Sequence, residues 1–284
     1  SKKGDNGRVL VIGGSKDYIG AVALVGLAAL RSGCDWVTIA APEKVAWAVN
    51  CLSADLVTVK LKGDYFSLKH YSEITKLAKK HDVVLLGNGL GLRKETKSFV
   101  KKTIKKINNL KVIDADAIKS LSLNDLENSI ITPHIKELEI FLQNSEINNP
   151  IIKKITNEKN IEKKAALLKK IIENHNIEEN NNKKIKNNFF EKNNFMLLKG
   201  PIDTIISKNQ IKFNKTGNAG MTKGGTGDVL AGLIAALACK NDPLRATLAG
   251  SFINKQAGDA LFKKVGPYFN ASDLAYEIQR VMFR

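Results

Sequence analysis

The start of the chain alternates short apolar runs with a longer run of small residues, and this pattern restricts the fold more than any other feature. Residues 8–13 and 36–40 are short, mostly apolar runs of the kind that form strands. Between them, residues 20–32 (GAVALVGLAALRS) predict a helix whose small side chains allow close packing on a sheet. Because two strands joined through a helix pair in parallel, the chain is expected to build a parallel sheet.

The alternation of strands and helices continues through the rest of the chain. Further strands are predicted at 82–86, 111–114 and 130–132, with helices at 94–107 and 135–142. Three more strands are predicted at 195–199, 204–207 and 210–214, followed by helices at 228–239, 243–262 and 271–282. Helices flanking a mostly parallel sheet give an α/β fold, a three-layer αβα sandwich, and we expect a single domain over residues 1–284.

Residues 143–194 interrupt this rhythm with a polar composition. They contain 14 Asn, 11 Lys and 7 Glu, and residues 174–188 approach low complexity. Residues 161–172 have the spacing of an amphipathic helix. We interpret the whole stretch as a polar Asn/Lys-rich insertion within the domain and expect it to be partly mobile; a functional tail is the alternative.

Membrane and secreted classes do not fit the sequence. No apolar stretch reaches the roughly 20 residues that span a bilayer, and no apolar region follows the charges of the N-terminus. Cys34, Cys51 and Cys239 lie far apart, no CxxC pair exists and the histidines are scattered, so neither a disulfide framework nor a zinc site is expected. We therefore expect a cytoplasmic protein with no membrane partner.

The strongly basic charge has two interpretations. The chain carries 45 Lys and Arg against 28 Asp and Glu, a net charge of +17, which would suit a polyanion. The basic residues are spread along the whole chain, however, and no RRM, KH or zinc-finger signature accompanies them. We favour a solvated basic surface with no specific nucleic-acid partner. A salt-sensitive shift of labelled DNA or RNA would favour the alternative.

Residues 214–231 (NKTGNAGMTKGGTGDVLA) contain the strongest chemical signal. Two glycine clusters precede an apolar helix that begins near Asp228. Glycines let backbone N–H groups converge on one point, and a helix start adds a partial positive charge, so this segment predicts a phosphate site. Asp228 is placed to accept a proton from a substrate hydroxyl during phosphoryl transfer. Its structural alternative is an N-cap, but the surrounding glycines favour catalysis.

Two common nucleotide motifs are missing from the sequence. The order GxxxxGK[ST] of a P-loop does not occur. The first turn carries Gly13, Gly14, Ser15 and Gly20 but not the G-x-G-x-x-G of a dinucleotide fold. A substrate can approach this backbone closely, whereas Rossmann-type binding of NAD is not expected.

The segment NKTGNAGMTKGGTGD resembles the signature of the nucleotide-dependent NAD(P)H-hydrate dehydratases, members of the ribokinase-like superfamily. Five other segments agree with that family in order and spacing. They are GRVLVIGGSKDYIGAVALVGLAALRSG (7–33), DVVLLGNGLG (82–91), VIDADAIKSL (112–121), ITPHIKELEIF (131–141) and LLKGPIDTIIS (197–207). The resemblance covers nearly the whole chain outside residues 143–194 and implies a ribokinase-like fold.

The resemblance also implies a reaction. ADP or ATP, assisted by Mg²⁺, phosphorylates the hydroxyl of the hydrated nicotinamide ring, and loss of phosphate restores NADH or NADPH. Phosphate leaves more readily than hydroxide, which explains the need for a nucleotide. The alternative within the same fold is a small-molecule kinase, for a vitamin precursor or a sugar. Relatives are commonly tetramers and often fused to an epimerase domain, so a homo-oligomer that works with an epimerase is expected.

The same resemblance assigns roles to particular residues. Asp228 is the base on the substrate hydroxyl and also contacts the substrate, and the N–H groups of Gly225, Thr226 and Gly227 form the anion hole. Lys199, Gly200, Pro201, Ile202 and Asp203 match the nucleotide-binding segment, and Gly227 matches a phosphate contact. Ala21, Gly89 and His134 match positions that contact the hydrated dinucleotide.

Most of these residues have a structural alternative. Ala21 can serve close helix packing, Gly89 can be a turn glycine, and a single histidine such as His134 is more often structural. The neighbouring glycines of GNGLG favour a ligand loop for Gly89, and the matched motif favours ligand contact for His134. Lys199 can be a solvated residue at a strand end, its side chain unimportant if the loop binds through its backbone.

Two further aspartates are candidates for magnesium binding, and the chain departs from the family motifs at two places. Asp114 and Asp116 can reach Mg²⁺ through water, or they can cap the next turn. Many relatives have GPGLG where this chain has Asn88 in GNGLG. Ile135 and Lys136 likewise replace Pro-Gly beside His134, which leaves the path of that loop less determined.

Overall fold

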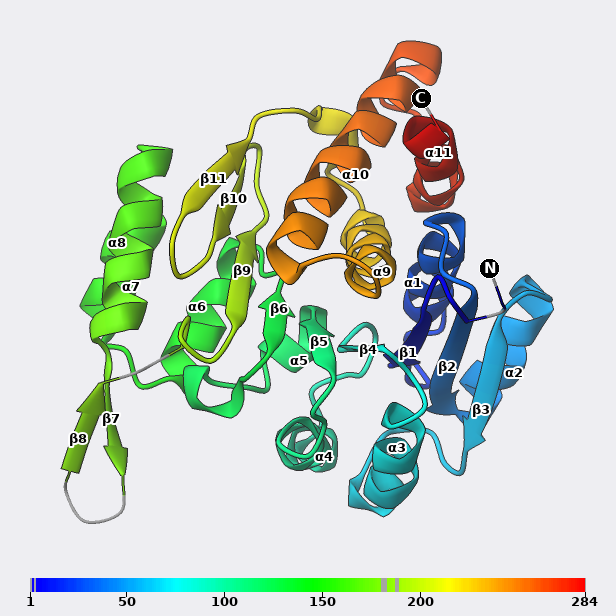
Figure 1. The fold of residues 1–284 in the computed structure, drawn as a ribbon, viewed down its shortest axis with the longest axis horizontal. Coiled ribbons are helices and arrows are strands. Elements are labelled where there is room, and N and C mark those ends of the chain that lie inside the picture. The colour runs from blue at the N-terminus through cyan, green and yellow to red at the C-terminus, as the bar shows by residue number, and fades with distance from the viewer. Residues whose placement is uncertain (1, 3, 180–182, 187–188, 284) are drawn as a thin grey trace.

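The computed structural model describes residues 2, 4–179, 183–186 and 189–283, and a nine-stranded sheet forms its centre (Figure 1). The strand order is β11-β10-β9-β6-β5-β4-β1-β2-β3; β10 is antiparallel to both of its neighbours, β9 and β11, and all other pairs are parallel. The strands are β1 Arg8–Ile12, β2 Trp36–Pro42, β3 Val57–Leu61, β4 Val83–Leu86, β5 Leu110–Ile113, β6 Ser129–Ile131, β9 Asn194–Leu198, β10 Asp203–Ile206 and β11 Ile211–Asn214. The expected α/β fold with a mostly parallel sheet is confirmed.

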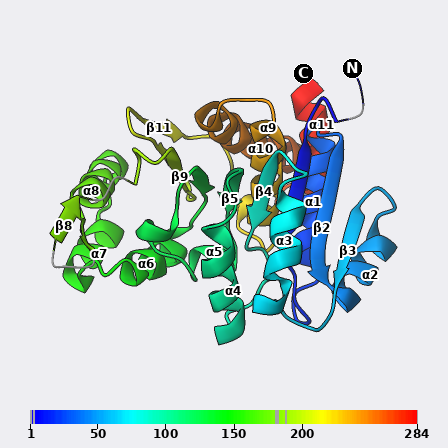
Figure 2. The same ribbon diagram turned by 60° about the horizontal axis from the view of Figure 1, so that its bottom comes forward.

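Helices cover both faces of the sheet (Figures 1 and 2). One layer contains α1 Gly20–Arg31, α2 Glu43–Leu52, α9 Thr226–Ala238 and α10 Pro243–Val265, with α11 Ala271–Phe283 packed on α1 and α10. The other contains α3 Tyr71–Ala78, α4 Lys94–Ile104, α5 Ala115–Ile118, α6 Ile135–Asn144, α7 Asn149–Asn157 and α8 Ile161–Asn174. In β1, Val9 and Val11 join the first core and Leu10 and Ile12 the second, because side chains alternate across a strand.

Small residues in α1 allow a close crossing with α9. A Cβ atom on Gly232 of α9 would lie 2.2 Å from the carbonyl oxygen of Val25 and 3.1 Å from Ala28 Cβ. Such a contact exists only where one helix presents glycine and the other presents small side chains. The Gly- and Ala-rich composition of residues 20–32 therefore serves helix–helix packing as well as packing on the sheet.

Residues 43–81 contain elements for which the sequence pattern made no prediction: α2, β3 and α3. β3 is the edge strand of the sheet, and only its last residue, Leu61, is buried. Lys60 and Thr58 are part-buried and bond the side chain of Asn50. An edge strand of this kind has no continuous apolar run, which is the signal that identified the central strands.

The interpretation of residues 143–194 as a polar insertion stays a prediction, but part of the stretch packs into the core. The predicted helix is confirmed as α8, and α7 lies beside it. Both helices bury apolar side chains in the core under the sheet, as do two phenylalanines that follow: Ile152, Ile155, Leu168, Ile172, Phe189 and Phe190. The buried residues of α7 and α8 recur at helical spacing, and the abundant Asn and Lys between them hide the pattern. The expected partial mobility of residues 143–194 stays a prediction, and residues 180–182 and 187–188 lie outside the described residues.

The strands β7 Asn176–Glu179 and β8 Lys183–Lys186 pair antiparallel and lie at one end of the molecule (Figure 1).

Within the described residues, no helix has both the length and the apolar character needed to cross a bilayer. Cys34, Cys51 and Cys239 are all free thiols. Burial raises the pKa of Cys34 to about 12, so this thiol stays protonated and unreactive.

Candidate active site

The polar groups of the chain converge where the parallel strands end. The chain leaves β1 in one direction to β2 and β3, and β4 pairs on the other side of β1, so the strand order switches between β1 and β4. Ligands of open α/β sheets bind at such a switch point, outside the carboxyl ends of the strands. Gly87 follows β4 with φ +141°, and a Cβ there would lie 1.8 Å from the carbonyl oxygen of Asp114. Only glycine allows the loops after β4 and β5 to touch.

Asp228 lies in the first turn of α9, and its carboxylate does not cap the helix. α9 begins at Thr226, and its N-cap residue is Gly225, which has φ +91° and makes no side-chain cap. Asp228 Oδ1 instead accepts a hydrogen bond of 2.6 Å from Asn88 Nδ2. The N-cap alternative for Asp228 is therefore wrong, and the carboxylate faces the end of β4.

Asp114 occupies the centre of a charged cluster. Its Oδ1 accepts from Thr132 Oγ1 at 2.7 Å and from Lys199 Nζ at 2.8 Å, and its Oδ2 accepts from Asn88 Nδ2 at 2.8 Å. Lys199 Nζ also lies 3.6 Å from Glu137 Oε2. Asp114 precedes α5 but makes no side-chain cap there, so the capping alternative does not hold for it. The Lys199 side chain is an ion-pair partner of two buried carboxylates and is not merely solvated.

Burial and neighbouring charges shift the pKa values of this cluster. Burial raises the pKa of Asp228 to about 7, and the charge of Asp114 adds to this, while the hydrogen bond from Asn88 and the charge of Lys199 act in the opposite direction. For Lys199, burial disfavours the charged form, but Asp114 and Glu137 outweigh it and raise the pKa. Lys199 is therefore a permanent cation, and Asp228 titrates near neutral pH, as a general base requires.

His134 has a structural role at the start of α6 and also lines the candidate site. Its Nδ1 accepts from the N–H groups of Lys136 and Glu137, and Glu137 Oε2 accepts in return from the N–H of His134, which forms a capping box at the start of α6. This box keeps the loop in shape although Ile135 and Lys136 replace Pro-Gly. Burial lowers the pKa of His134, so the imidazole is neutral and its Nε2 carries the proton.

Asp116 and Asp114 do not form a magnesium site. Asp116 accepts from the N–H of Gly91 and pairs with Lys119. Asp114 has donors on both of its oxygens, one of them the cation Lys199. No group of three or more His, Cys, Asp or Glu side chains that could hold a metal occurs among the residues that the structure describes. These residues do not fit a metal ion held by the protein itself.

A cavity of about 920 Å³ opens beside the start of α9. It is lined by residues from the end of β9, the glycine-rich segment, α9 and α10: His134, Lys199, Gly200, Pro201, Asp203, Gly217, Asn218, Ala219, Met221, Thr222, Lys223, Gly224, Thr226, Gly227, Leu230, Asn254 and Lys255. Of the residues matched to nucleotide binding, Ile202 alone is missing from this lining.

The start of α9 offers backbone donors to this cavity. The N–H groups of Gly225 and Gly227 have no acceptor in the described part of the chain, whereas the N–H of Thr226 points at the carbonyl of Lys223, 3.5 Å away. Lys199 Nζ lies 3.4 Å from the place that a Cβ on Gly227 would take, so a cation stands next to these donors. Two of the three predicted anion-hole groups are thus available, and Thr226 is the least available of them.

Lys255 of α10 is a site residue that the sequence analysis missed. Its Nζ donates to the carbonyls of Gly200 at 2.9 Å and Pro201 at 3.0 Å and lies 3.2 Å from Asp203 Oδ1. Asp259, one turn further along α10, accepts from the N–H of Gly217 and from Asn218 Nδ2. Two charged residues one helical turn apart, Lys255 and Asp259, were the available signal. Lys255 holds the loop at Gly200 and Pro201, and Asp259 holds the loop at Gly217 and Asn218; both loops line the cavity.

Ala21 and Gly89 are brought together on another side of Asn88. Gly89 has φ +69°, and a Cβ there would lie 2.9 Å from Tyr18 Cβ and 3.4 Å from Ala21 Cβ. Both the close-packing and the turn alternatives therefore hold for these residues. They are not among the described residues that line the 920 Å³ cavity, whereas His134 is. Of the three substrate candidates, His134 therefore lies at the cavity, whereas Ala21 and Gly89 contact each other outside its lining.

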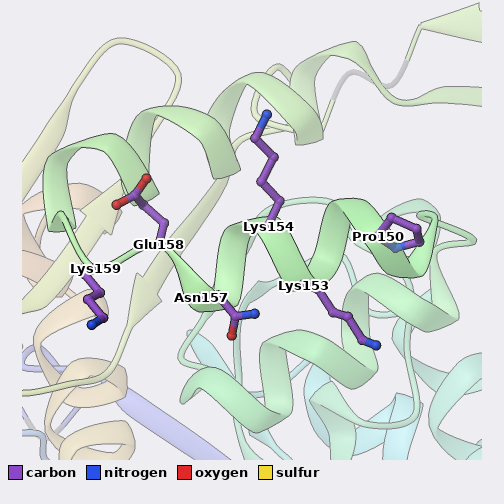
Figure 3. Close-up of a pocket in the computed structure, with 6 residues that line it drawn as sticks. All are labelled: Pro150, Lys153, Lys154, Asn157, Glu158 and Lys159. Carbon is purple, nitrogen blue, oxygen red and sulfur yellow. The ribbon is translucent and has the colours of Figure 1, made fainter.

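A second hollow, of about 560 Å³, lies along α7 and the loop that follows it (Figure 3). Its lining residues are Pro150, Lys153, Lys154, Asn157, Glu158 and Lys159. Figure 3 shows the three lysine side chains pointing in different directions, so their charges do not converge on one ligand. This hollow has no buried polar group comparable to Asp228 or Asp114.

Fold and site together define the class: this is an α/β protein of ribokinase-like architecture with a glycine-rich loop at the start of α9. A ribokinase-like protein of Enterococcus faecalis superposes with a TM-score of 0.77 at 23% identity, covering 100% of this chain and 89% of that one. The ADP/ATP-dependent NAD(P)H-hydrate dehydratase of Bacillus subtilis, co-crystallised with ATP and Mg²⁺, gives 0.73 at 22% identity, covering 100% and 91%. At these identities the likeness concerns the fold.

The chain belongs to the NAD(P)H-hydrate dehydratase family, whose model matches residues 9–280. It is 40% identical over 285 residues to a bifunctional NAD(P)H-hydrate repair enzyme of Methanocaldococcus jannaschii, covering 99% of this chain and 49% of that protein. It is 30% identical to an ADP-dependent (S)-NAD(P)H-hydrate dehydratase of Cenarchaeum symbiosum, covering 99% and 90%. The chain thus spans about half the length of the bifunctional relative.

Proposed function

We propose that this chain catalyses the nucleotide-dependent dehydration of hydrated NADH or NADPH. One observation carries the proposal within the family: a carboxylate that titrates near pH 7 shares the first turn of α9 with the unpaired N–H of Gly227. This turn can hold a phosphoryl group and deprotonate a hydroxyl at adjacent positions. The name of the relative from Cenarchaeum symbiosum supports this reaction and ADP as the co-substrate.

The residues suit the steps of such a reaction. The nucleotide occupies the 920 Å³ cavity against Lys199, Gly200, Pro201 and Asp203, with Ile202 supporting that loop from outside the lining. The transferring phosphoryl group lies against the N–H groups of Gly225 and Gly227, with Thr226 contributing least. Asp228 takes the proton of the ring hydroxyl while the hydroxyl oxygen attacks the transferring phosphorus. As the new P–O bond forms, the bond to the leaving oxygen of the nucleotide breaks, which releases AMP from ADP or ADP from ATP. The electron pair of the ring nitrogen then expels inorganic phosphate as the C–O bond breaks, and loss of a proton from the neighbouring ring carbon restores the C=C bond of the reduced ring.

The hydrated dinucleotide is proposed to bind from the side of Ala21 and Gly89, the positions that match the substrate contacts of the family. His134 contributes an Nε2–H donor from the cavity side. We propose that Mg²⁺ arrives bound to the nucleotide phosphates, because Asp114 and Asp116 are engaged by other protein groups. Bound in this way, Mg²⁺ neutralises phosphate charge without a dedicated protein cage.

The decisive experiment incubates the protein with hydrated NADH, Mg²⁺ and either ADP or ATP. Recovery of the absorbance of the reduced ring, with release of one phosphate per ring restored, is the expected result. A stable phosphorylated product without recovery would instead identify a small-molecule kinase. Absence of any turnover with the hydrates of both NADH and NADPH would overturn the proposal.

The pH dependence of the reaction follows from Asp228. Because the pKa of this carboxyl is raised to about 7, it is mostly protonated below that pH and cannot act as a base. We expect kcat/KM to rise about tenfold per pH unit below pH 7 and to level off above it. A profile of kcat/KM from pH 5 to 9 measures this. A profile that is flat between pH 5 and 7 would contradict the role of Asp228.

Lys255 gives a separate prediction for nucleotide binding. Replacing it with Met removes the cation that holds the carbonyls of Gly200 and Pro201, so the loop loses its position. We expect the KM for the nucleotide to rise about tenfold or more, with a much smaller effect on the KM for the hydrate. Lys212→Met, at an exposed position of β11, is the matched control and should leave both constants unchanged. Equal effects on the two KM values would argue against this role of Lys255.

Assembly and location remain proposals. The bifunctional relative supports cooperation with a second repair activity, which we propose to be an epimerase acting on the same hydrates. We propose a homo-oligomer, to be tested by light scattering. The three free thiols suit a reducing cytoplasm.

A further inference from the structure

Asn88 connects two carboxylates of the site through a single amide nitrogen. Its Nδ2 donates to Asp114 Oδ2 at 2.8 Å and to Asp228 Oδ1 at 2.6 Å, and it joins segments that are 26 and 140 residues away in the chain. The Asn88 side chain is fully buried. Each of the two amide hydrogens therefore has one carboxylate oxygen as its acceptor.

The orientation of the amide is fixed by chemistry. If the side chain were turned over, its oxygen would face two carboxylates, whereas the nitrogen donates to both. The Oδ1 atom is left buried without a hydrogen-bond partner among the described residues. An unpartnered buried oxygen destabilises a fold. Asn88 therefore lowers the stability of the fold at this position, which suggests that its nitrogen has a function.

The backbone around Asn88 holds this donor in place. Asn88 lies between Gly87 (φ +141°) and Gly89 (φ +69°), and its carbonyl accepts from the N–H of Gly14 at 2.8 Å. A Cβ on Gly13 would lie 2.4 Å from the same carbonyl oxygen. The loops after β1 and β4 thus clamp Asn88 at the strand-order switch, and the amide cannot follow Asp228 if that residue moves.

We propose that Asn88 is a positioning residue that uses both amide hydrogens to hold the Asp228 carboxylate beside Asp114 in the orientation that accepts the proton of the substrate. The inference rests on the proposed function for the identity of that substrate. The geometric part does not: Asn88 fixes one oxygen of Asp228 and leaves Oδ2 without a protein partner in the described part of the chain. Oδ2 is then the oxygen that meets the hydroxyl.

Three charged groups face Asp228 besides this amide. Asp114 follows β5 and Glu137 belongs to α6, and both favour the protonated form of Asp228, whereas Lys199 after β9 favours the ionised form. The hydrogen bond from Asn88 also favours the ionised form, because a carboxylate accepts better than a carboxylic acid. Burial and the charge of Asp114 raise the pKa of Asp228, and the hydrogen bond from Asn88 lowers it. Removing the amide should therefore raise the pKa of Asp228.

The test uses Asn88→Leu, which keeps the branched shape without the amide, and Asn88→Ala. The pKa of Asp228 is measured by carboxyl-carbon NMR of aspartate-labelled protein, with the resonance assigned through its loss in Asp228→Asn. We expect the pKa to rise by about one unit or more in both variants, and the acid limb of kcat/KM to move up equally. Asn109→Ala is the control. Its amide donates to the carbonyls of Ala78 and His81, away from the site.

The readouts separate the two proposals. A raised pKa in the Asn88 variants and an unchanged one in Asn109→Ala support the positioning role, whether or not hydrates are turned over. An unchanged pKa of Asp228 in both Asn88 variants would overturn it. A loss of kcat that is equal at pH 6.5 and 8.5 would also count against it, because a purely structural role affects both pH values alike. Missing turnover in the wild-type protein would reject the proposed function and leave the NMR result to decide on Asn88.

Discussion

Replacing Asp228 with Asn is expected to lower turnover about a thousandfold while the protein stays folded. The variant keeps an oxygen that can accept the 2.6 Å hydrogen bond from Asn88 Nδ2, so the first turn of α9 retains its position. An amide cannot take a proton from a hydroxyl, so the substitution removes the base and little else. The measurement is kcat for hydrate repair at pH 8 with ADP and with ATP, accompanied by circular dichroism.

The same substitution should stabilise the protein above neutral pH. Burial raises the pKa of Asp228 to about 7 from its usual 3.8. Between these values the folded protein holds a proton that the unfolded chain has released, so the stability of the wild type falls as the pH rises through this window. Asparagine has no proton to lose. We expect Asp228→Asn to be about 4 kcal/mol more stable than wild type at pH 8 and nearly equal to it at pH 4.

The matched control is Asp242→Asn at the start of α10. Asp242 Oδ1 caps that helix through the N–H groups of Leu244 and Arg245, and asparagine caps as well as aspartate. Turnover of this variant should equal that of the wild type. Wild-type turnover in Asp228→Asn would reject Asp228 as the base, and a lower melting temperature at pH 8 would show that its carboxylate is not destabilised by burial.

Replacing Lys199 with Met is expected to destabilise the fold by about 4 kcal/mol and to lower turnover at least tenfold. Lys199 Nζ lies 2.8 Å from Asp114 Oδ1 and 3.6 Å from Glu137 Oε2, and both carboxylates are buried. Without the cation they remain as uncompensated negative charge. They also raise the proton affinity of Asp228, so the acid limb of the pH profile should move upward. Urea unfolding and the pH profile measure the two effects.

An exposed lysine in a similar pair provides the comparison. Lys208 Nζ lies 2.7 Å from Glu191 Oε2, but both side chains are more than half exposed, at 55% and 56%. We expect Lys208→Met to change the free energy of unfolding by less than about 0.5 kcal/mol, because water screens the pair. If Lys199→Met were equally mild, the Lys199 cluster would not contribute to stability as its burial implies.

The elements that the sequence predicted share one physical property. β1, β4 and α9 are buried on all sides, so selection for apolar residues leaves an uninterrupted signal. β3 and α7 were missed because each exposes part of its surface and mixes Lys, Asn or Thr with its apolar residues. The boundaries of α9 also shifted: the helix starts at Thr226 and not near Asp228, since the glycine at 225 can take the left-handed conformation that begins it.

The candidate site was predictable where one segment of the chain contains it. The glycine-rich loop, the helix after it and Asp228 lie within a few residues of each other, so their sequence indicates a phosphate site with a base beside it. Lys255, Asn88 and Glu137 were not assigned roles, because each acts through a residue far away in the chain. Lys255 supports a loop 54 and 55 residues before it. The neighbouring sequence shows a charged residue in α10 but not the loop that it contacts.

For Gly224 to Asp228, the sequence alone determined that backbone N–H groups and a carboxylate meet at a helix start, because glycine conformation and helix polarity are local properties. Only the tertiary structure decided what that carboxylate does. Asn88, 140 residues away in the chain, donates a hydrogen bond to the carboxylate of Asp228 and holds it in place. Lys199 lies 85 residues from Asp114 in the chain and forms an ion pair with it. Burial then raises the pKa of Asp228 to about 7. Proton affinity depends on surrounding charge and solvent, which the fold creates from all parts of the chain.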